Sequence, residues 1–288
     1  MTTVECPAVP GVRHSCVETA GLRWHVAEAG SGQPVLLLHS WPQHWWAWRK
    51  VIPLLGPDHH VICPDLRGFG WTDAPRTGYG TQALVDDVLA LLDALGLDRV
   101  TVVGHDVGGR IGFQLALRAP DRVRRLVTLN AAHPYWTART MGLAGAARFW
   151  WTPLVETPLV GRWLVRFVVR LYFHLGADRG VLSEAEVAEY VARMREPARA
   201  RASERLMYEF AYREIVPALL GRGRERRLTV PTLMLAGERD PHLSPKSLGG
   251  WEPHADELTL RIVPDAGHLL AEQCPDLVAD AIRGFAGS

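Results

Sequence analysis

Val102-Val103-Gly104-His105-Asp106-Val107-Gly108-Gly109 is the stretch that decides the fold of this 288-residue chain. Its first residues are apolar and of strand type, and a helical pattern follows at once from Arg110 to Arg118. Glycines at 104 and 108 permit close packing around a sharp strand-to-helix turn, which pushes the side chain at 106 into the open above a sheet. The stretch therefore predicts a nucleophile elbow with Asp106 at its tip.

An aspartate at the tip narrows the chemistry, because serine is the usual residue there. Attack by serine on a saturated carbon would give an ether, which activated water cannot cleave. Attack by a carboxylate gives an ester, which activated water can cleave. Asp106 therefore favours substitution at carbon, with an epoxide oxygen or a halide leaving, over a peptidase or an ordinary esterase. The structural alternative is an aspartate that caps the following helix.

Apolar runs of strand length recur on both sides of the elbow. They are mostly continuous rather than alternating, which is typical of parallel strands covered on both faces by helices. An antiparallel hairpin with its turn at Gly21 precedes them. Including the hairpin, the predicted strands are 12–18, 22–29, 35–38, 61–63, 100–103, 126–129, 232–235 and 260–263. Residues 81–95 carry an apolar stripe of helical period and supply a covering helix. We predict an α/β fold with a mostly parallel, eight-stranded sheet.

The pattern changes between about 131 and 217, where strand-like runs give way to helix-forming, aromatic-rich sequence such as 184–196 and 203–215. An insertion between strands of a parallel sheet is expected over the carboxyl ends of the strands, where such sheets bind ligands. We therefore predict a helical cap domain at 131–217 and a core domain formed by 1–130 and 218–288.

Composition limits the classes of partner. Hydrophobic residues make up 48% of the chain and charged residues 22%, enough to bury a substantial core. The formal net charge is +1, from 32 basic and 31 acidic residues, and no long block of like charge occurs. The chain therefore lacks the electrostatic footprint of a nucleic-acid-binding protein. A neutral or apolar small molecule is the expected ligand.

The four cysteines are scattered, at positions 6, 16, 63 and 274. No C-x-x-C spacing occurs, so their spacing suggests neither a zinc site nor a redox motif.

The first residues lack a charged segment followed by an apolar one, and the apolar stretch 163–173 is interrupted by Arg166 and Arg170. We expect a soluble, cytoplasmic protein with no metal.

Two further residues complete a catalytic triad. His268, in Pro264-Asp265-Ala266-Gly267-His268-Leu269, follows the last predicted strand and would activate water. Asp240 follows the seventh strand and would orient the imidazole, and the chain order nucleophile, acid, histidine is the order expected for such a fold. The alternative position for the acid, after the sixth strand, holds Asn130, which cannot stabilise an imidazolium by charge.

The oxyanion formed during ester hydrolysis requires two N–H donors. The backbone N–H of Val107, directly after the nucleophile, is one predicted donor. The other is the backbone N–H of Trp41, in the loop His39-Ser40-Trp41-Pro42 after an early strand.

These residues resemble the epoxide hydrolase branch of the α/β-hydrolase superfamily, which is related to the haloalkane and haloacid dehalogenases. The resemblance covers nearly the whole chain and rests on five motifs: His39–Pro42 for the family's H-G-x-P loop, Asp65–Gly70, the Asp106 elbow, Gly237–Pro241 and His268. Ser40 departs from the family glycine. The resemblance implies an α/β-hydrolase fold, and His39, Arg110 and Trp150 are expected to contact substrate.

In that family two cap tyrosines usually hold and protonate the epoxide oxygen. Tyr212 matches the second, whereas Trp151 stands where the first would fall. An indole N–H donates a hydrogen bond but does not give up its proton, so Tyr212 would be the single general acid. Plain packing within the cap is the alternative role of Trp150 and Trp151. The Trp-Trp-Tyr set also resembles epoxide hydrolases of aromatic polyketide pathways, which points to a large polycyclic substrate.

We therefore predict an epoxide hydrolase that needs no metal or organic cofactor. Its expected partners are a hydrophobic or aromatic epoxide and water, with no nucleic acid or membrane; a homodimer is left open. The alternative is a haloalkane or haloacid dehalogenase with the same triad. The haloacid type carries arginines one and four residues after the nucleophile, and only Arg110 matches, since position 107 is valine. A ligand-binding protein that keeps the fold without turnover is the third reading.

Overall fold

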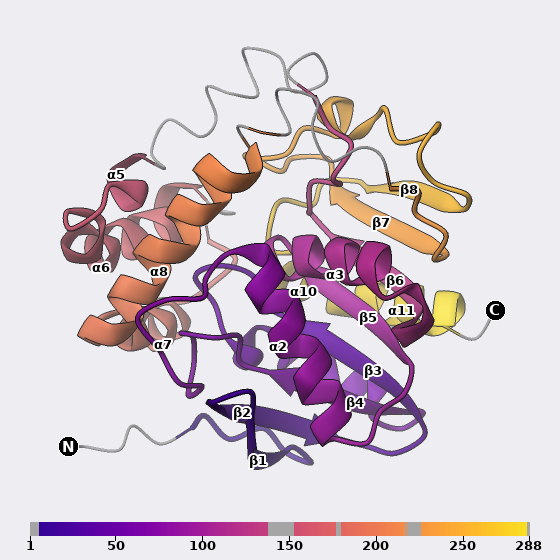
Figure 1. Cartoon of the computed structure of the whole chain (residues 1–288), viewed down its shortest axis with the longest axis horizontal. Helices are drawn as coiled ribbons and strands as arrows, with labels where there is room; N and C mark the ends of the chain where they lie inside the picture. The colour runs from indigo at the N-terminus through magenta and orange to yellow at the C-terminus, as the bar shows by residue number, and fades with distance from the viewer. Residues whose placement is uncertain (1–5, 138–152, 177–179, 216, 218–225, 287–288) are drawn as a thin grey trace.

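Eight strands form a single sheet in the computed structural model, which describes residues 6–137, 153–176, 180–215, 217 and 226–286 (Figure 1). The strand order across the sheet is β1-β2-β4-β3-β5-β6-β7-β8. The strands are β1 (Arg13–Thr19), β2 (Leu22–Ala29), β3 (Gln33–Leu38), β4 (His59–Pro64), β5 (Val100–His105), β6 (Val123–Leu129), β7 (Thr232–Gly237) and β8 (Leu258–Val263). Each corresponds to a predicted strand, so the predicted sheet is confirmed.

The sheet is antiparallel only at its β1 edge. Strands β1 and β2 form the predicted hairpin, with Thr19 opposite Leu22 and with Ala20 and Gly21 at positive φ in the turn. Strand β2 also pairs antiparallel with β4, and the remaining neighbours are parallel. Because parallel strands end on the same side, the loops after β3 to β8 gather at one edge.

Helices cover both faces of the sheet, which explains the continuous apolar runs. Leu36 and Leu38 of β3 pack in the core cluster that also contains residues of α2 and α3, whereas Val35 and Leu37 pack in the cluster that contains residues of α11. Successive strand residues point to opposite faces, so both sets must be apolar. The core helices are α1 (Ile52–Leu55), α2 (Thr81–Ala94), α3 (Val107–Arg118), α10 (Leu270–Gln273) and α11 (Pro275–Ala286), with short 3₁₀ helices η1 (Trp45–Trp48), η2 (Pro120–Arg122) and η5 (Pro245–Leu248).

A group of helices from the predicted cap lies beside the strand ends, at the left of Figure 1. Ser183 begins one of them with a capping box, in which its hydroxyl accepts from the Glu186 N–H and the Glu186 carboxylate accepts from the Ser183 N–H. The helices are α5 (Pro153–Glu156), α6 (Gly161–Leu171), the π-helix η3 (Tyr172–Gly176), α7 (Glu184–Met194), α8 (Pro197–Phe210) and the π-helix η4 (Ala211–Ile215). The boundaries proposed between core and cap stay a prediction.

Two buried arginines fasten the cap helices to the loop after β4. Arg193 Nη2 donates to the Gly70 carbonyl at 2.8 Å, and Arg199 Nη1 donates to the Thr72 carbonyl at 2.8 Å. Both side chains also pair with Glu196. These contacts hold the cap helices over the carboxyl ends of the strands, where a parallel sheet binds ligands.

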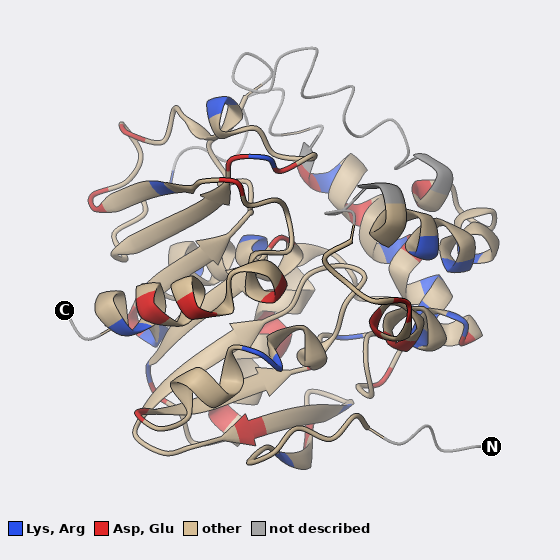
Figure 2. Ribbon diagram, turned by 180° about the vertical axis from the view of Figure 1, so that it is seen from behind, with Lys and Arg blue, Asp and Glu red and all other residues tan. Residues whose placement is uncertain are grey.

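Charged residues are interspersed along the chain, and Figure 2 shows acidic and basic positions side by side on the core helices and the cap helices. This distribution agrees with the balanced net charge of +1. Within the described ranges, no helix has the length and apolar character required to cross a bilayer.

Glycines at 104 and 108 are required by the turn between β5 and α3. A Cβ at Gly108 would overlap the Leu38 carbonyl of the neighbouring strand, and a Cβ at Gly104 would overlap the Gly108 carbonyl. The backbone therefore approaches closely on both sides of Asp106, which adopts a φ of 46° and a ψ of −106°. A non-glycine residue with that φ is uncommon and is held by its surroundings.

We predict that Gly108→Ala lowers the free energy of unfolding by about 3 kcal/mol, because a buried backbone must move to admit the methyl group. Chemical denaturation followed by circular dichroism measures the loss. Gly284→Ala, in α11 with no neighbour within 4 Å of the added Cβ, is the matched control. It should be neutral or slightly stabilising. Equal effects of the two changes would contradict this account of the turn.

Candidate active site

Asp106 stands at the tip of the β5–α3 turn, as the elbow motif predicts. One of its carboxylate oxygens accepts a hydrogen bond from the Ser40 hydroxyl at 3.0 Å, and its backbone N–H donates to the Leu129 carbonyl at 3.0 Å. Its side chain makes no capping bond to α3. Asp106 is therefore not there to cap the helix, and its side chain lines a cavity instead.

Asp240 and His268 form the expected acid–imidazole pair. Nδ1 of His268 lies 2.9 Å from one oxygen of Asp240, and both side chains are buried. The other oxygen of Asp240 accepts from the N–H groups of His242 and Leu243 at 2.7 and 3.0 Å. Burial raises the pKa of Asp240, but the charge and hydrogen bonds around it outweigh burial and hold that pKa below its usual range. The carboxylate thus keeps the proton of His268 on Nδ1, which leaves Nε2 to act as a base.

Asn130, which occupies the alternative position for the acid of the triad, makes hydrogen bonds to backbone groups rather than to the His268 ring. Its amide nitrogen donates to the carbonyls of Gly267 and His268 at 2.8 and 2.7 Å, and its amide oxygen accepts from the Gly237 N–H at 2.7 Å. The His105 ring donates to the same His268 carbonyl at 2.8 Å, and burial lowers the pKa of His105 to about 3. These two side chains fix the loop that carries His268.

The His39 ring stabilises the loop after β3 through hydrogen bonds at both of its nitrogens. Its Nδ1 donates to the Ser40 carbonyl at 2.9 Å, and its Nε2 accepts from the Leu66 N–H at 2.9 Å. Both ring nitrogens are therefore occupied inside the protein, and the side chain is buried. These bonds give the ring a positioning role in the loop, and its predicted contact with substrate stays a prediction. Trp41, two residues on, reaches the cap through its indole N–H, which donates to the Ser203 hydroxyl at 2.6 Å.

A small cavity of about 50 Å³ joins the predicted residues. Trp41, Asp106, Val107, Arg110 and His268 all line it. The rest of its wall is mostly apolar and comes largely from the cap, chiefly Trp136, Tyr172, Met207 and Phe210. An apolar wall of this kind suits a hydrophobic ligand.

Tyr212, the predicted general acid, does not line this cavity. Its side chain is 53% exposed, and its ring lies 4.8 Å from that of Tyr208. Residues two apart on a helix point in nearly opposite directions, so Tyr212 turns outward when Phe210 lines the cavity. Trp150 and Trp151, the other two predicted cap residues, lie outside the described residues.

Tyr172 and His242 line the cavity although sequence reasoning did not select them. Their rings stack in parallel with centroids 5.4 Å apart, and His242 meets the His268 ring edge-on at 5.0 Å. Tyr172 also contacts Trp41 edge-on at 5.2 Å. His242 could have been suspected from its place two residues after Asp240. No comparable signal marks Tyr172, which reaches the cavity from the π-helix η3.

Arg110 lines the cavity, but its charge is already paired. Its Nη1 lies 2.7 Å from the Glu214 carboxylate, and its guanidinium carbon lies 3.6 Å from the centroid of the Phe210 ring. The ion pair with Glu214 already offsets the positive charge of Arg110, although its Nε is buried without a hydrogen-bond partner among the described residues.

Comparison with known proteins places these residues in context. A family described as "alpha/beta hydrolase fold" matches residues 33–274. A soluble epoxide hydrolase of Corynebacterium sp. (strain C12) is 33% identical, over 96% of this chain and 98% of that protein. A fluoroacetate dehalogenase of Burkholderia sp. is 27% identical, over 96% and 94%. The solved structure of epoxide hydrolase CorEH without ligand is 30% identical, with a TM-score of 0.82 over 96% and 99%.

We predict that the pairing of Asp240 makes stability depend on pH. Its pKa in the folded protein lies below the unfolded value of about 3.9, so its contribution is complete above that pH and is lost as the pH falls through the folded pKa. Asp240→Asn removes this titration. The difference in unfolding free energy between wild type and variant should therefore be constant above about pH 5 and shrink as the pH falls below about 4, measured by urea denaturation. A difference independent of pH would contradict the assignment.

Proposed function

Because the chain belongs to the α/β-hydrolase fold family, in its epoxide hydrolase branch, we propose that it opens an epoxide to a vicinal diol through an ester on Asp106. One observation carries the proposal: the Asp106 carboxylate and the His268 imidazole, the latter paired with Asp240, line the same apolar cavity. A nucleophile, a base and an orienting acid are the groups that a two-step displacement at carbon requires.

In the first step, an oxygen of Asp106 attacks an epoxide carbon and the bond between that carbon and the ring oxygen breaks. The ring oxygen leaves as an alkoxide that takes a proton from a donor in the cap. Ser40 donates a hydrogen bond to one carboxylate oxygen and so helps to hold the nucleophile in one orientation. The product of this step is a hydroxyalkyl ester of Asp106.

In the second step, Nε2 of His268 takes a proton from water, and the oxygen of that water attacks the ester carbonyl carbon. The oxyanion accepts hydrogen bonds from the backbone N–H groups of Val107 and Trp41. Asp240 stabilises the imidazolium that forms. Collapse of the intermediate releases the diol as His268 returns its proton to the leaving alkoxide oxygen. The second proton of the water, left on the Asp106 carboxyl, then passes to the cap donor that was deprotonated in the first step, which restores both groups.

Among the described residues that line this cavity, Tyr172 is the one phenol that can donate a proton to the departing oxygen. A phenol gives up its proton far more readily than an indole, and Tyr172 lines the cavity beside Trp41 whereas Tyr212 is exposed. We therefore assign to Tyr172 the role that the resemblance had given to Tyr212. Trp41 shapes the wall next to it, with its indole N–H engaged by Ser203.

Dehalogenation is the competing function, since a fluoroacetate dehalogenase is among the relatives. A haloacid brings a carboxylate that needs a free cation near the nucleophile. Arg110 lines the cavity but is paired with Glu214, so its place does not favour an anionic substrate. A neutral epoxide fits this wall better.

We predict that His268→Gln traps the ester, because the base that activates water is gone. After incubation with aromatic epoxides, the intact mass should rise by the mass of one whole epoxide, and turnover should fall by about 10³-fold or more. The same variant is also incubated with alkyl halides, and a gain equal to an alkyl halide minus hydrogen halide would instead establish a dehalogenase. Asp106→Asn in the same background is the control that should show no adduct. No adduct from any substrate, with an inert wild type, would refute the proposal.

Two tyrosine variants test the proton donor. We predict that Tyr172→Phe lowers kcat for epoxide hydrolysis by about 10²-fold, since general acid catalysis contributes at least that much. Tyr212→Phe, the matched change at an exposed tyrosine, should leave kcat within about twofold. Steady-state kinetics on one epoxide measure both. The reverse pattern would show that Tyr212, not Tyr172, serves the reaction.

A further inference from the structure

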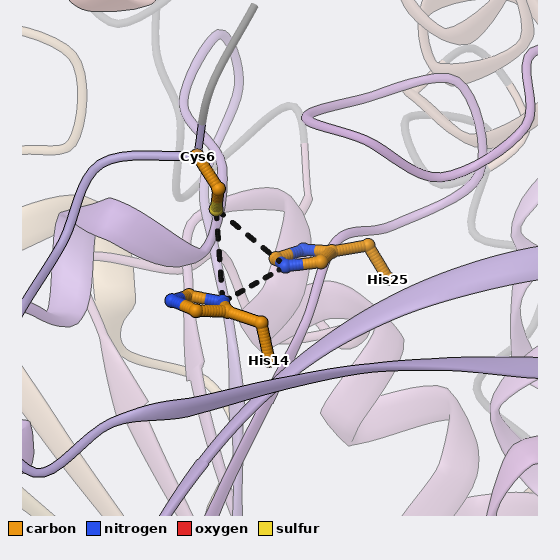
Figure 3. A group of neighbouring side chains, drawn as sticks. All are labelled: Cys6, His14 and His25. Atoms are coloured by element: carbon orange, nitrogen blue, oxygen red, sulfur yellow. Dashed lines mark hydrogen bonds between the residues drawn. The ribbon is translucent and has the colours of Figure 1, made fainter. Parts of the chain in front are cut away.

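Cys6, His14 and His25 converge at the antiparallel edge of the sheet, as Figure 3 shows. Cys6 precedes β1, His14 lies on β1 and His25 lies on β2. None of the three lines the active-site cavity, and β4 and β3 separate β2 from the nucleophile strand β5. The group is therefore distinct from the catalytic residues.

The hairpin register explains how the two histidines meet. His14 pairs with Ala27, and His25 pairs with Cys16. His14 and His25 are thus diagonal neighbours on one face of an antiparallel pair, within reach of each other's long side chains. The segment before β1 then brings the Cys6 sulfur against both rings.

The distances within the group fit the edges of a tetrahedral metal site. Sγ of Cys6 lies 3.6 Å from Nδ1 of His14 and 3.6 Å from Nε2 of His25, and the two nitrogens lie 3.0 Å apart. Zinc bound at about 2.3 Å from sulfur and 2.05 Å from nitrogen separates sulfur from nitrogen by about 3.6 Å and two nitrogens by about 3.3 Å. A shift of a few tenths of an ångström in one ring completes the fit.

A buried carboxylate orients His25 as a ligand. Nδ1 of His25 lies 2.7 Å from Oδ2 of Asp65, which also accepts from the Trp71 N–H, and Oδ1 of Asp65 accepts from the Trp45 N–H. A carboxylate that accepts these bonds requires the proton of His25 to be on Nδ1. Nε2 therefore presents its lone pair to Cys6 and His14, in the arrangement of a carboxylate, a histidine and a metal.

We propose that Cys6, His14 and His25 bind one zinc ion, which fastens the segment before β1 to the β1–β2 hairpin. One thiolate and two imidazoles are ligands that suit zinc. His14 is exposed, so water can complete the four-coordinate shell from the solvent side. The ion takes no part in epoxide opening, and the site stands whether or not that function does.

The test uses the full chain after removal of metal by a chelator. Added zinc should bind at one ion per chain and raise Tm by about 5 °C at a concentration 100-fold above Kd. Cobalt in place of zinc should give the absorption of a thiolate-to-metal charge transfer with tetrahedral d–d bands. Cys6→Ser should abolish the charge transfer, and His14→Asn should weaken binding by about 10-fold or more.

Cys16→Ser is the matched control. Cys16 lies opposite His25 in the hairpin and is exposed, but its sulfur is not part of the group. This variant should bind metal as wild type does. Failure of the wild type to bind zinc at one ion per chain would overturn the proposal and leave a hydrogen-bonded cluster. Equal binding by wild type and Cys6→Ser would overturn it too, because the metal would then lie elsewhere.

Discussion

The close backbone contact between the β5–α3 turn and strand β3 is the constraint on which the rest of the site depends. Gly108 packs against the Leu38 carbonyl with no space for a side chain, and Gly104 packs against Gly108 in the same way. The contact forces Asp106 into a positive φ and lifts its carboxylate out of the sheet. It also sets the start of α3 at Val107, directly after Asp106, which is where the proposed mechanism needs an N–H donor for the oxyanion.

The position of His268, the proposed base, depends on a second set of contacts, between the loops that follow β6, β7 and β8. Asn130 bridges Gly237 and the carbonyls of Gly267 and His268, and a Cβ at Gly237 would overlap the Gly267 carbonyl. With the loop held in this way, the single hydrogen bond between Asp240 and Nδ1 of His268 fixes the orientation of the imidazole ring. Buried polar groups that are fully satisfied in this way give a rigid site, which reduces the reorganisation needed during the reaction.

The cap supplies most of the apolar wall of the cavity that Asp106 and His268 line. It is attached to the core by arginine side chains on backbone carbonyls and by the Trp41–Ser203 hydrogen bond, so it closes the cavity without contributing to the triad. Tyr172 and Phe210 enter the cavity from separate cap helices. In the proposed mechanism, changes in the cap would therefore alter the substrate and the proton donor and leave the proposed ester chemistry at Asp106 unchanged.

Local patterns in the sequence were enough to predict the strands, the turn at Asp106 and the pairing of Asp240 with His268, because each depends on local periodicity or on the residue that follows a strand. Tertiary structure alone decided that Tyr172 rather than Tyr212 lines the cavity, that His39 braces its loop, and that Cys6 meets two histidines. Those outcomes depend on which face a helix buries and on which strand positions become neighbours. Contacts of this kind join residues far apart in the chain, and no local pattern encodes them.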